Sequence, residues 1–200
     1  MKRMFFIVFL ISFAVSVAVA GGYGTGDKAA DFKLKNVDGK FISFSNYPDA
    51  KGFVVIFTCN HCPYAQAYQD RIIEIDKKYK VLGYPVIAIS PSDPELVPAD
   101  SYDKMVAVAN SNGYTFPYLI DANQEVYKRY GATKTPTAFL LQRQTDNLFV
   151  AYNGAIDNNY QDALKVTEPY LANVLDALLA GKQPDPQTTK AIGCGIQSKK

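Results

Sequence analysis

Two kinds of hydrophobic spacing alternate along the chain, and together they predict a mixed α/β fold. Residues 53–57 form an uninterrupted run of β-branched and aromatic side chains, which is typical of a strand covered on both faces. A second apolar run at 84–90 predicts another buried strand. Pro63 marks the start of a helix between them, and Gly83 marks its end. Apolar residues on one face of this helix recur every three or four positions: Ala65, Tyr68, Ile72, Ile75 and Tyr79.

Weaker patterns supply elements on either side of this unit. An Asp-Gly pair at 38–39 separates two short alternating runs at 32–34 and 41–44, which predicts a β-hairpin. Apolar runs at 137–141 and 148–152 are joined by a polar turn, and we expect them to form an antiparallel edge of the sheet. Further signals predict helices at 103–109 and 124–130, a strand at 116–120 and a terminal helix at 162–179.

This alternation of strands and helices favours an α/β sheet with right-handed crossovers between parallel neighbours. The terminal helix contains Pro169, so we expect it to be kinked or to begin later than its pattern does. A chain of 200 residues has room for one domain with a sizeable core. We place that domain at 27–181, after a small-residue linker at 21–26 and before an irregular C-terminal tail at 182–200.

The N-terminus differs from the rest of the chain. Lys2 and Arg3 precede an almost wholly apolar stretch at 4–19, and Ala-Val-Ala at 18–20 has the small-x-small pattern of a cleavage site. Residues 1–20 are therefore predicted to be a secretory signal peptide. A membrane anchor is the alternative, but the apolar run is short for the roughly 20 residues of a span. We expect an exported protein, periplasmic or secreted, without stable membrane insertion after cleavage.

Composition limits the function classes further. The formal net charge is +2, with 48% hydrophobic and 20% charged residues. These values are ordinary for a globular protein, and the positive charge is too small to indicate a nucleic-acid partner or an anionic membrane.

Three cysteines carry the candidate chemistry, and two of them form the segment Cys59-Asn60-His61-Cys62 between the buried strand and the helix. A helix N-terminus has unpaired N–H groups and a positive dipole, which stabilise a thiolate. The only histidine, His61, would stabilise it further as a cation. We expect Cys59 to be the more exposed sulfur and the attacking nucleophile, and Cys62 to resolve the mixed disulfide.

Two other uses of this segment carry less weight. A structural Cys59–Cys62 disulfide would close a very short loop and constrain little of the unfolded chain. A zinc site needs about four ligands, whereas three of the candidates crowd into one turn. We therefore predict no metal and no organic cofactor. For Cys194 two interpretations stay open: a tail cysteine without a partner, or a third thiol that folds back, exchanges with Cys59 and caps the dithiol.

A Thr135-Pro136 pair precedes a strand far downstream of the dithiol. With the strand, C-x-x-C and helix, it makes the chain resemble the thioredoxin superfamily. More closely, the chain is similar to the peroxiredoxin-like, thiol-specific antioxidant (AhpC/TSA) group. The matching stretches cover almost all of the mature chain: residues 32–40, 57–64, 116–119, 130–136, 154–157 and 189–194.

The resemblance implies a thioredoxin-like fold, with a central mixed sheet flanked by helices and an N-terminal β-hairpin extension. It also implies that Pro136 is cis beside the dithiol and that the backbone at Thr135 pairs with bound substrate. The chain departs from the family at Thr58, where thioredoxins have Trp, and in lacking a buried acid within 53–57.

We therefore predict an exported thiol–disulfide oxidoreductase. Its partners would be thiol- or disulfide-containing proteins or small molecules, together with a redox partner that the sequence does not identify. The alternatives are a peroxiredoxin-like, thiol-dependent peroxidase and a redox-inert binding module on the same fold.

Overall fold

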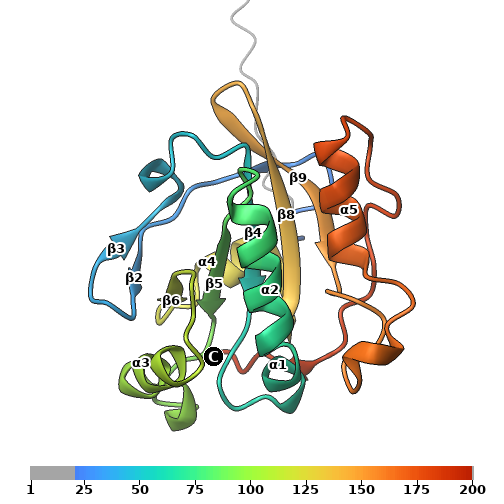
Figure 1. Ribbon diagram of the computed structural model, residues 1–200. Helices are drawn as coiled ribbons and strands as arrows, with labels where there is room; N and C mark the ends of the chain where they lie inside the picture. The colour runs from blue at the N-terminus through green and yellow to red at the C-terminus, as the bar shows by residue number, and fades with distance from the viewer. Residues whose placement is uncertain (1–20, 200) are drawn as a thin grey trace, which may run out of the picture.

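A computed structural model describes residues 21–199, so the predicted signal peptide lies outside the described residues. Its framework is an eight-stranded mixed sheet (Figure 1). The strands are β1 (Lys28–Ala29), β2 (Leu34–Asn36), β3 (Phe41–Ile42), β4 (Gly52–Phe57), β5 (Val86–Ser90), β6 (Tyr118–Ile120), β7 (Lys134–Thr135), β8 (Thr137–Gln144), β9 (Asn147–Gly154) and β10 (Cys194–Gly195). The large sheet has the order β1-β9-β8-β4-β5-β6-β2-β3, and β7 pairs with β10 in a separate small sheet.

Strand β4 lies at the centre, parallel to β5 and antiparallel to β8. All of its residues are buried, as the continuous apolar run predicts. Val54 and Ile56 face one core, whereas Phe53, Val55 and Phe57 face the other. Burying each such side chain stabilises the fold by about 1.5–3 kcal/mol. This two-sided burial fixes the position of the loop that follows β4.

Helices cover both faces of the sheet (Figure 1). They are α1 (Pro63–Ala67), α2 (Gln69–Lys80), α3 (Tyr102–Ser111), α4 (Val126–Tyr130) and α5 (Tyr170–Leu179), with short 3₁₀ turns at Phe44–Asn46, Pro98–Asp100 and Ala163–Lys165. Apolar residues of α2, α3 and α5 pack on one face, and those of α4 pack on the other with the N-terminal segment. None of the helices in this part of the chain is long and apolar enough to cross a membrane. The thioredoxin-like α/β fold and its hairpin extension, β2–β3, are confirmed.

Two features of the fold differ from the sequence prediction, and one expectation is confirmed. The helix after Pro63 is broken at Tyr68, where α1 ends and α2 begins. The terminal helix begins only at Tyr170, after Pro169, as expected, because proline cannot donate an intrahelical hydrogen bond. The β8–β9 hairpin is not an edge, since β1 pairs with β9. Two residues are too few for a detectable alternating pattern, so β1 had no sequence signal.

The C-terminal tail, predicted as irregular, contains an ordered strand. Cys194 pairs antiparallel with Thr135, and Gly195 pairs with Lys134. The preceding stretch also contacts the main sheet, where Thr188 bridges to Asn153. In Figure 1 the red tail passes the lower end of the sheet near α1 before reaching the C-terminus. The tail therefore runs across the end of the domain where the cysteine motif lies.

Candidate active site

The cysteine motif occupies the turn between β4 and α1. Cys62 is the N-cap of α1 and Pro63 its first residue, as the sequence predicts. The amide groups of His61 and Cys62 point toward the Cys59 sulfur and favour its thiolate. N–H groups at a helix start stabilise negative charge nearby. The turn thus provides an electropositive environment that stabilises a thiolate at Cys59.

The disulfide in this structure joins Cys62 to Cys194, with their Cα atoms 6.0 Å apart. Cys59 remains a free thiol. The tail does fold back and cap the turn, but Cys194 bonds to Cys62 and not to Cys59, and the interpretation of Cys194 as a partnerless tail cysteine is wrong. Cys59 is the more exposed of the two motif cysteines, as expected, but both are buried, at 3% exposed against a fully buried Cys62. Cys194 packs against both of them and covers the turn.

Thr135 contacts all three cysteines. Its hydroxyl lies 3.1 Å from the Cys59 sulfur, and its carbonyl oxygen lies 3.3 Å from the Cys62 sulfur. Its backbone pairs with Cys194 in the small sheet. The Thr135–Pro136 peptide bond is cis, as the family resemblance implies. The structure therefore brings the predicted substrate-binding pair together with the predicted redox residues.

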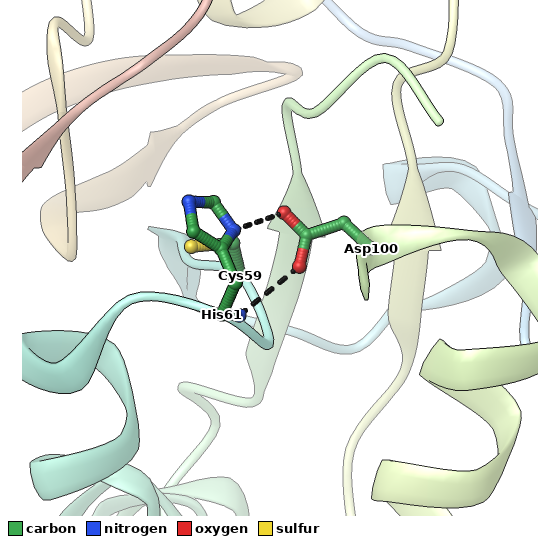
Figure 2. A group of neighbouring side chains, drawn as sticks. All are labelled: Cys59, His61 and Asp100. Carbon is green, nitrogen blue, oxygen red and sulfur yellow. Dashed lines mark hydrogen bonds and ion pairs between the residues drawn. The ribbon is translucent and has the colours of Figure 1, made fainter. Parts of the chain in front are cut away.

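Asp100 is a component of the site that sequence reasoning missed. It is fully buried, and Figure 2 shows its carboxylate between the backbone and the ring of His61. The carboxylate accepts from the Asn60 amide at 2.8 Å and from the His61 amide at 3.2 Å. Its second oxygen lies 2.7 Å from His61 Nδ1 and accepts the hydroxyl of Ser92. The buried acid that residues 53–57 lack is thus supplied by a different loop.

A signal for this acid does exist in the topology. Strands β4 and β5 are parallel, so their carboxyl ends meet at one edge of the sheet. The loop after β5 carries Ser92 and Asp100 to the same edge as Cys59 and His61. Ligand- and substrate-binding groups gather at such carboxyl ends in α/β sheets. An acidic residue in this loop could therefore have been proposed as a member of the site from its position in the topology alone, without any sequence motif.

The pKa of Cys59 is raised to about 11 in this form. Burial is the largest cause, because the charged thiolate loses its hydration. The Thr135 hydroxyl lowers the pKa, the negative charge of Asp100 raises it, and the two backbone amides lower it. Cys59 is consequently a protonated thiol near neutral pH while the tail covers it.

Cys59, His61 and Asp100 also form a possible set of metal ligands, since one donor atom from each lies within 4.8 Å of the others. The set offers a sulfur, an imidazole nitrogen and a carboxylate oxygen, a mixture that suits zinc. Its His61 nitrogen is already bonded to Asp100, and Cys62, the nearest further sulfur in the motif, is engaged with Cys194. A metal ion would have to replace these interactions, so the arrangement fits thiol chemistry better.

The AhpC/TSA family model matches residues 25–155, which span β4, the cysteine turn and Pro136. The chain belongs to the AhpC/TSA family. Its relatives include the thiol-disulfide oxidoreductase ResA of Halalkalibacterium halodurans, 24% identical over 144 residues covering 72% of this chain and 77% of that protein. ResA of Oceanobacillus iheyensis is 29% identical over 161 residues, with 76% and 73% covered.

Solved structures share the fold of this AhpC/TSA chain. An uncharacterized conserved protein from Geobacillus kaustophilus has a TM-score of 0.81 and 34% identity, covering 88% of this chain and 93% of that one. The peroxidoxin BcpB from Mycobacterium tuberculosis, at 18% identity and a TM-score of 0.58, shares the fold over 78% of this chain and 96% of its own. The protein is an oxidoreductase of the thioredoxin superfamily.

In this AhpC/TSA protein the site holds a free thiol beside a disulfide at a helix start. Such a set of three sulfurs can undergo thiol–disulfide exchange without an external oxidant or reductant, because exchange only moves the S–S bond between partners. The thiolate of Cys59 can attack the Cys62 sulfur and release Cys194. A closed tail and an open tail would then be two isomers of the same oxidation state.

Proposed function

We propose that this protein is an exported thiol–disulfide oxidoreductase whose Cys59–Cys62 pair exchanges disulfides with thiol- or disulfide-containing substrates. The observation that carries the proposal is the free thiol of Cys59 beside the Cys62–Cys194 disulfide, with Thr135 in contact with all three residues. No metal or organic cofactor enters the proposed reaction, because the two electrons reside in sulfur.

In the proposed reaction, the Cys62 thiolate attacks a substrate disulfide, one substrate sulfur leaves as a thiolate, and the other bonds to Cys62 at the place that Cys194 occupies here. These roles reverse the sequence expectation, in which Cys59 attacks first and Cys62 resolves the mixed disulfide. The Cys59 thiolate attacks the Cys62 sulfur, the Cys59–Cys62 bond forms, and the substrate leaves as a thiolate that takes up a proton. Two electrons pass to the substrate disulfide and the dithiol becomes oxidised. Thr135 and Pro136 would position the substrate strand, and His61 would act with Asp100 beside the attacking sulfur.

Export rests on the sequence of residues 1–20, with support from chemistry. A disulfide between Cys62 and Cys194 persists most readily in an oxidising compartment such as the periplasm or the exterior. N-terminal sequencing of the mature protein from a cell-envelope fraction tests this part. A start near Gly21 is expected, whereas an intact Met1 in the cytosolic fraction would contradict it.

The test of the activity is equilibration in glutathione buffers, followed by alkylation of free thiols and mass spectrometry. We expect one two-electron transition, with disulfides at Cys62–Cys194 and Cys59–Cys62. Changing both Cys59→Ser and Cys194→Ser should trap Cys62 in a mixed disulfide with a model substrate and stop turnover, because either thiol could otherwise displace the substrate from Cys62. A protein whose cysteines never cycle, or full turnover in Cys62→Ser, would refute the proposal and favour a redox-inert binding module.

Peroxide attack and disulfide exchange both need a Cys59 thiolate, and burial raises the pKa of this thiol to about 11 in the tail-closed form. The disulfide between Cys62 and Cys194 favours exchange over peroxidase chemistry, because it places a second sulfur on Cys62. Peroxide consumption with excess reductant separates the two activities. We expect disulfide reduction to proceed much faster than peroxide consumption.

A further inference from the structure

The tail is held along much of its length, and not only by its disulfide. The Thr189 amide donates to the Asn153 carbonyl at 3.0 Å, and the Ile196 amide donates to the Thr133 carbonyl at 3.1 Å. Between them Cys194 pairs with Thr135. The tail is therefore an extended strand whose cysteine is delivered to Cys62 by main-chain hydrogen bonds. A polypeptide substrate that paired with Thr135 and bonded to Cys62 would have to occupy the position of the tail.

The residue before the tail cysteine has no room for a side chain. A Cβ atom on Gly193 would collide with the Thr135 carbonyl oxygen, and would lie 2.6 Å from its carbonyl carbon and 3.1 Å from the Pro136 nitrogen. All three are backbone atoms, which cannot move aside as a flexible side chain does. A Cβ on Gly195, on the other side of the cysteine, would meet nothing within 4 Å. The groove therefore admits only glycine at the position before the cysteine, whereas it leaves room for a side chain at the position after it.

Gln124 forms hydrogen bonds to the main chain of the tail beyond Cys194. Its side-chain nitrogen donates to the Gln197 carbonyl at 2.7 Å, and its side-chain oxygen accepts the Lys199 amide at 2.8 Å. The residue is almost completely buried and adopts a φ of 59°, a left-handed conformation that is uncommon outside glycine. A buried carboxamide in a constrained conformation, with both ends on tail backbone, is suited to hold any extended chain in this register.

An acidic pair lies at the far end of the same path. The Lys199 ammonium is 2.7 Å from an Asp93 carboxylate oxygen and 3.3 Å from one of Glu95. Asp93 is buried, and the nearby ammonium lowers the pKa of its carboxyl. A buried carboxylate is costly without a cation or hydrogen-bond donors. This end of the path therefore favours a positive side chain five residues after the cysteine.

We infer that the tail is a built-in substrate strand and that its groove, formed by β7, Gln124 and the Asp93–Glu95 pair, selects extended polypeptides. The selected segment has glycine immediately before its cysteine and a lysine or arginine five residues after it. This inference rests on the proposed function and names its substrate class. When the groove is empty of the tail, a partner cysteine takes the place of Cys194 on Cys62.

The electron balance is that of ordinary exchange. The Cys62 thiolate attacks the partner cysteine of a disulfide, a Cys62–partner bond forms, and the original partner thiolate leaves. Cys59 then attacks Cys62, and the partner cysteine leaves as a second thiolate. For the tail itself, the Cys62–Cys194 bond breaks as the Cys59–Cys62 bond forms, with no net oxidation. The same groove thus serves an external strand and the internal one.

The test uses full-length protein carrying Cys59→Ser and Cys194→Ser, so that Cys62 is the sole cysteine. Synthetic peptides with the sequence of residues 187–199 carry their cysteine as a mixed disulfide with glutathione. The measured quantity is the rate at which the peptide–Cys62 adduct forms, followed by mass spectrometry. The protein's own tail competes equally with every peptide, so ratios between peptides are unaffected by it.

Matched peptide variants separate the two selected positions from their neighbours. We expect Gly193→Ala to slow adduct formation by about tenfold or more, equivalent to ~1.4 kcal/mol, and Gly195→Ala to leave it within about twofold. Lys199→Glu should slow it roughly fivefold at low salt and less at high salt, whereas the same change at exposed Lys190 should have little effect.

Two outcomes would overturn the inference, and they are distinguishable. Equal rates for Gly193→Ala and Gly195→Ala, with Cys62 reacting readily with glutathione disulfide, would remove the groove's selectivity and leave the proposed function intact. A Cys62 that forms no adduct with any peptide or with glutathione disulfide would overturn both.

Discussion

On one side of the Cys59 turn, Asp100 closes a set of hydrogen bonds within the domain, whereas on the other side the tail brings Cys194 onto Cys62. The Asp100 side is non-covalent, and its fully buried carboxylate accepts hydrogen bonds from backbone, imidazole and hydroxyl donors. The tail side depends on one S–S bond and on main-chain pairing with β7. Only the tail side can be opened by thiol exchange.

The pKa and reactivity of the Cys59 thiol are therefore set by two contributions: one from Asp100, which does not depend on the tail, and one from the tail, which can be removed. The charge of Asp100 raises the pKa of this thiol, and its hydrogen bonds to Asn60, His61 and Ser92 do not involve the tail. Burial, the larger cause, comes in part from Cys194, which packs on the turn. Opening the tail should therefore make Cys59 more acidic and more reactive, while Asp100 keeps the His61 ring in place.

The largest expected effect comes from breaking the tail side. A Cys194→Ser change removes a cross-link between residues separated by 132 positions. By chain entropy a loop of this length contributes about 5 kcal/mol to the free energy of unfolding. We expect urea unfolding of the oxidised protein to lose most of that amount. Wild-type protein under reductant is the matched control and should approach the variant; oxidised wild type no more stable than Cys194→Ser would contradict the pairing.

Next in size is the pH dependence of Cys59 reactivity. With its pKa raised to about 11 by burial, alkylation by iodoacetamide in the oxidised protein should rise about tenfold per pH unit between about pH 7 and pH 10. Folding raises this pKa above the unfolded value of about 8.5. The associated stability is therefore fully present below that pH and is lost as the pH rises toward 11.

The same alkylation experiment tests whether the tail supplies the cover. In reduced Cys194→Ser, where no Cys59–Cys62 disulfide consumes the thiol, the profile should shift to lower pH, because Cys59 loses part of its burial. Mass spectrometry of the Cys59 peptide gives the rate at each pH. A plateau near pH 8 in oxidised wild type, or identical profiles for the two proteins, would show that the tail does not control this thiol.

The same contrast explains what the sequence could predict. Strand β4 and the cysteine turn were predictable, because a continuous apolar run and a proline at a helix start are local signals. The roles of Thr135 and Pro136 came from family resemblance. The partner of Cys62 lies 132 residues away and that of His61 lies 39 residues away. Contacts over such distances leave no periodic pattern in the sequence. The disulfide that covers the site and the carboxylate that brings negative charge to it could therefore be found only from the three-dimensional structure.

The smallest expected effect comes from the Asp100 side, and it has two parts of opposite sign. Asp100→Asn keeps the shape of the side chain but replaces one of its two acceptor oxygens with an NH2 group. One of the present hydrogen-bond donors then loses its acceptor, which should lower the free energy of unfolding by about 1–3 kcal/mol. The same change removes a charge that raises the pKa of Cys59, so alkylation near neutral pH should become faster.

Asp157 provides the matched control for this prediction. It is also buried and accepts hydrogen bonds from Tyr68 and Arg71, but Asp100 and not Asp157 is the carboxylate that shifts the Cys59 pKa. Asp157→Asn should therefore lower stability without speeding alkylation. If both variants changed Cys59 reactivity alike, the effect would be general loosening of the fold. An acceleration confined to Asp100→Asn would show that this carboxylate acts on the thiol through its charge.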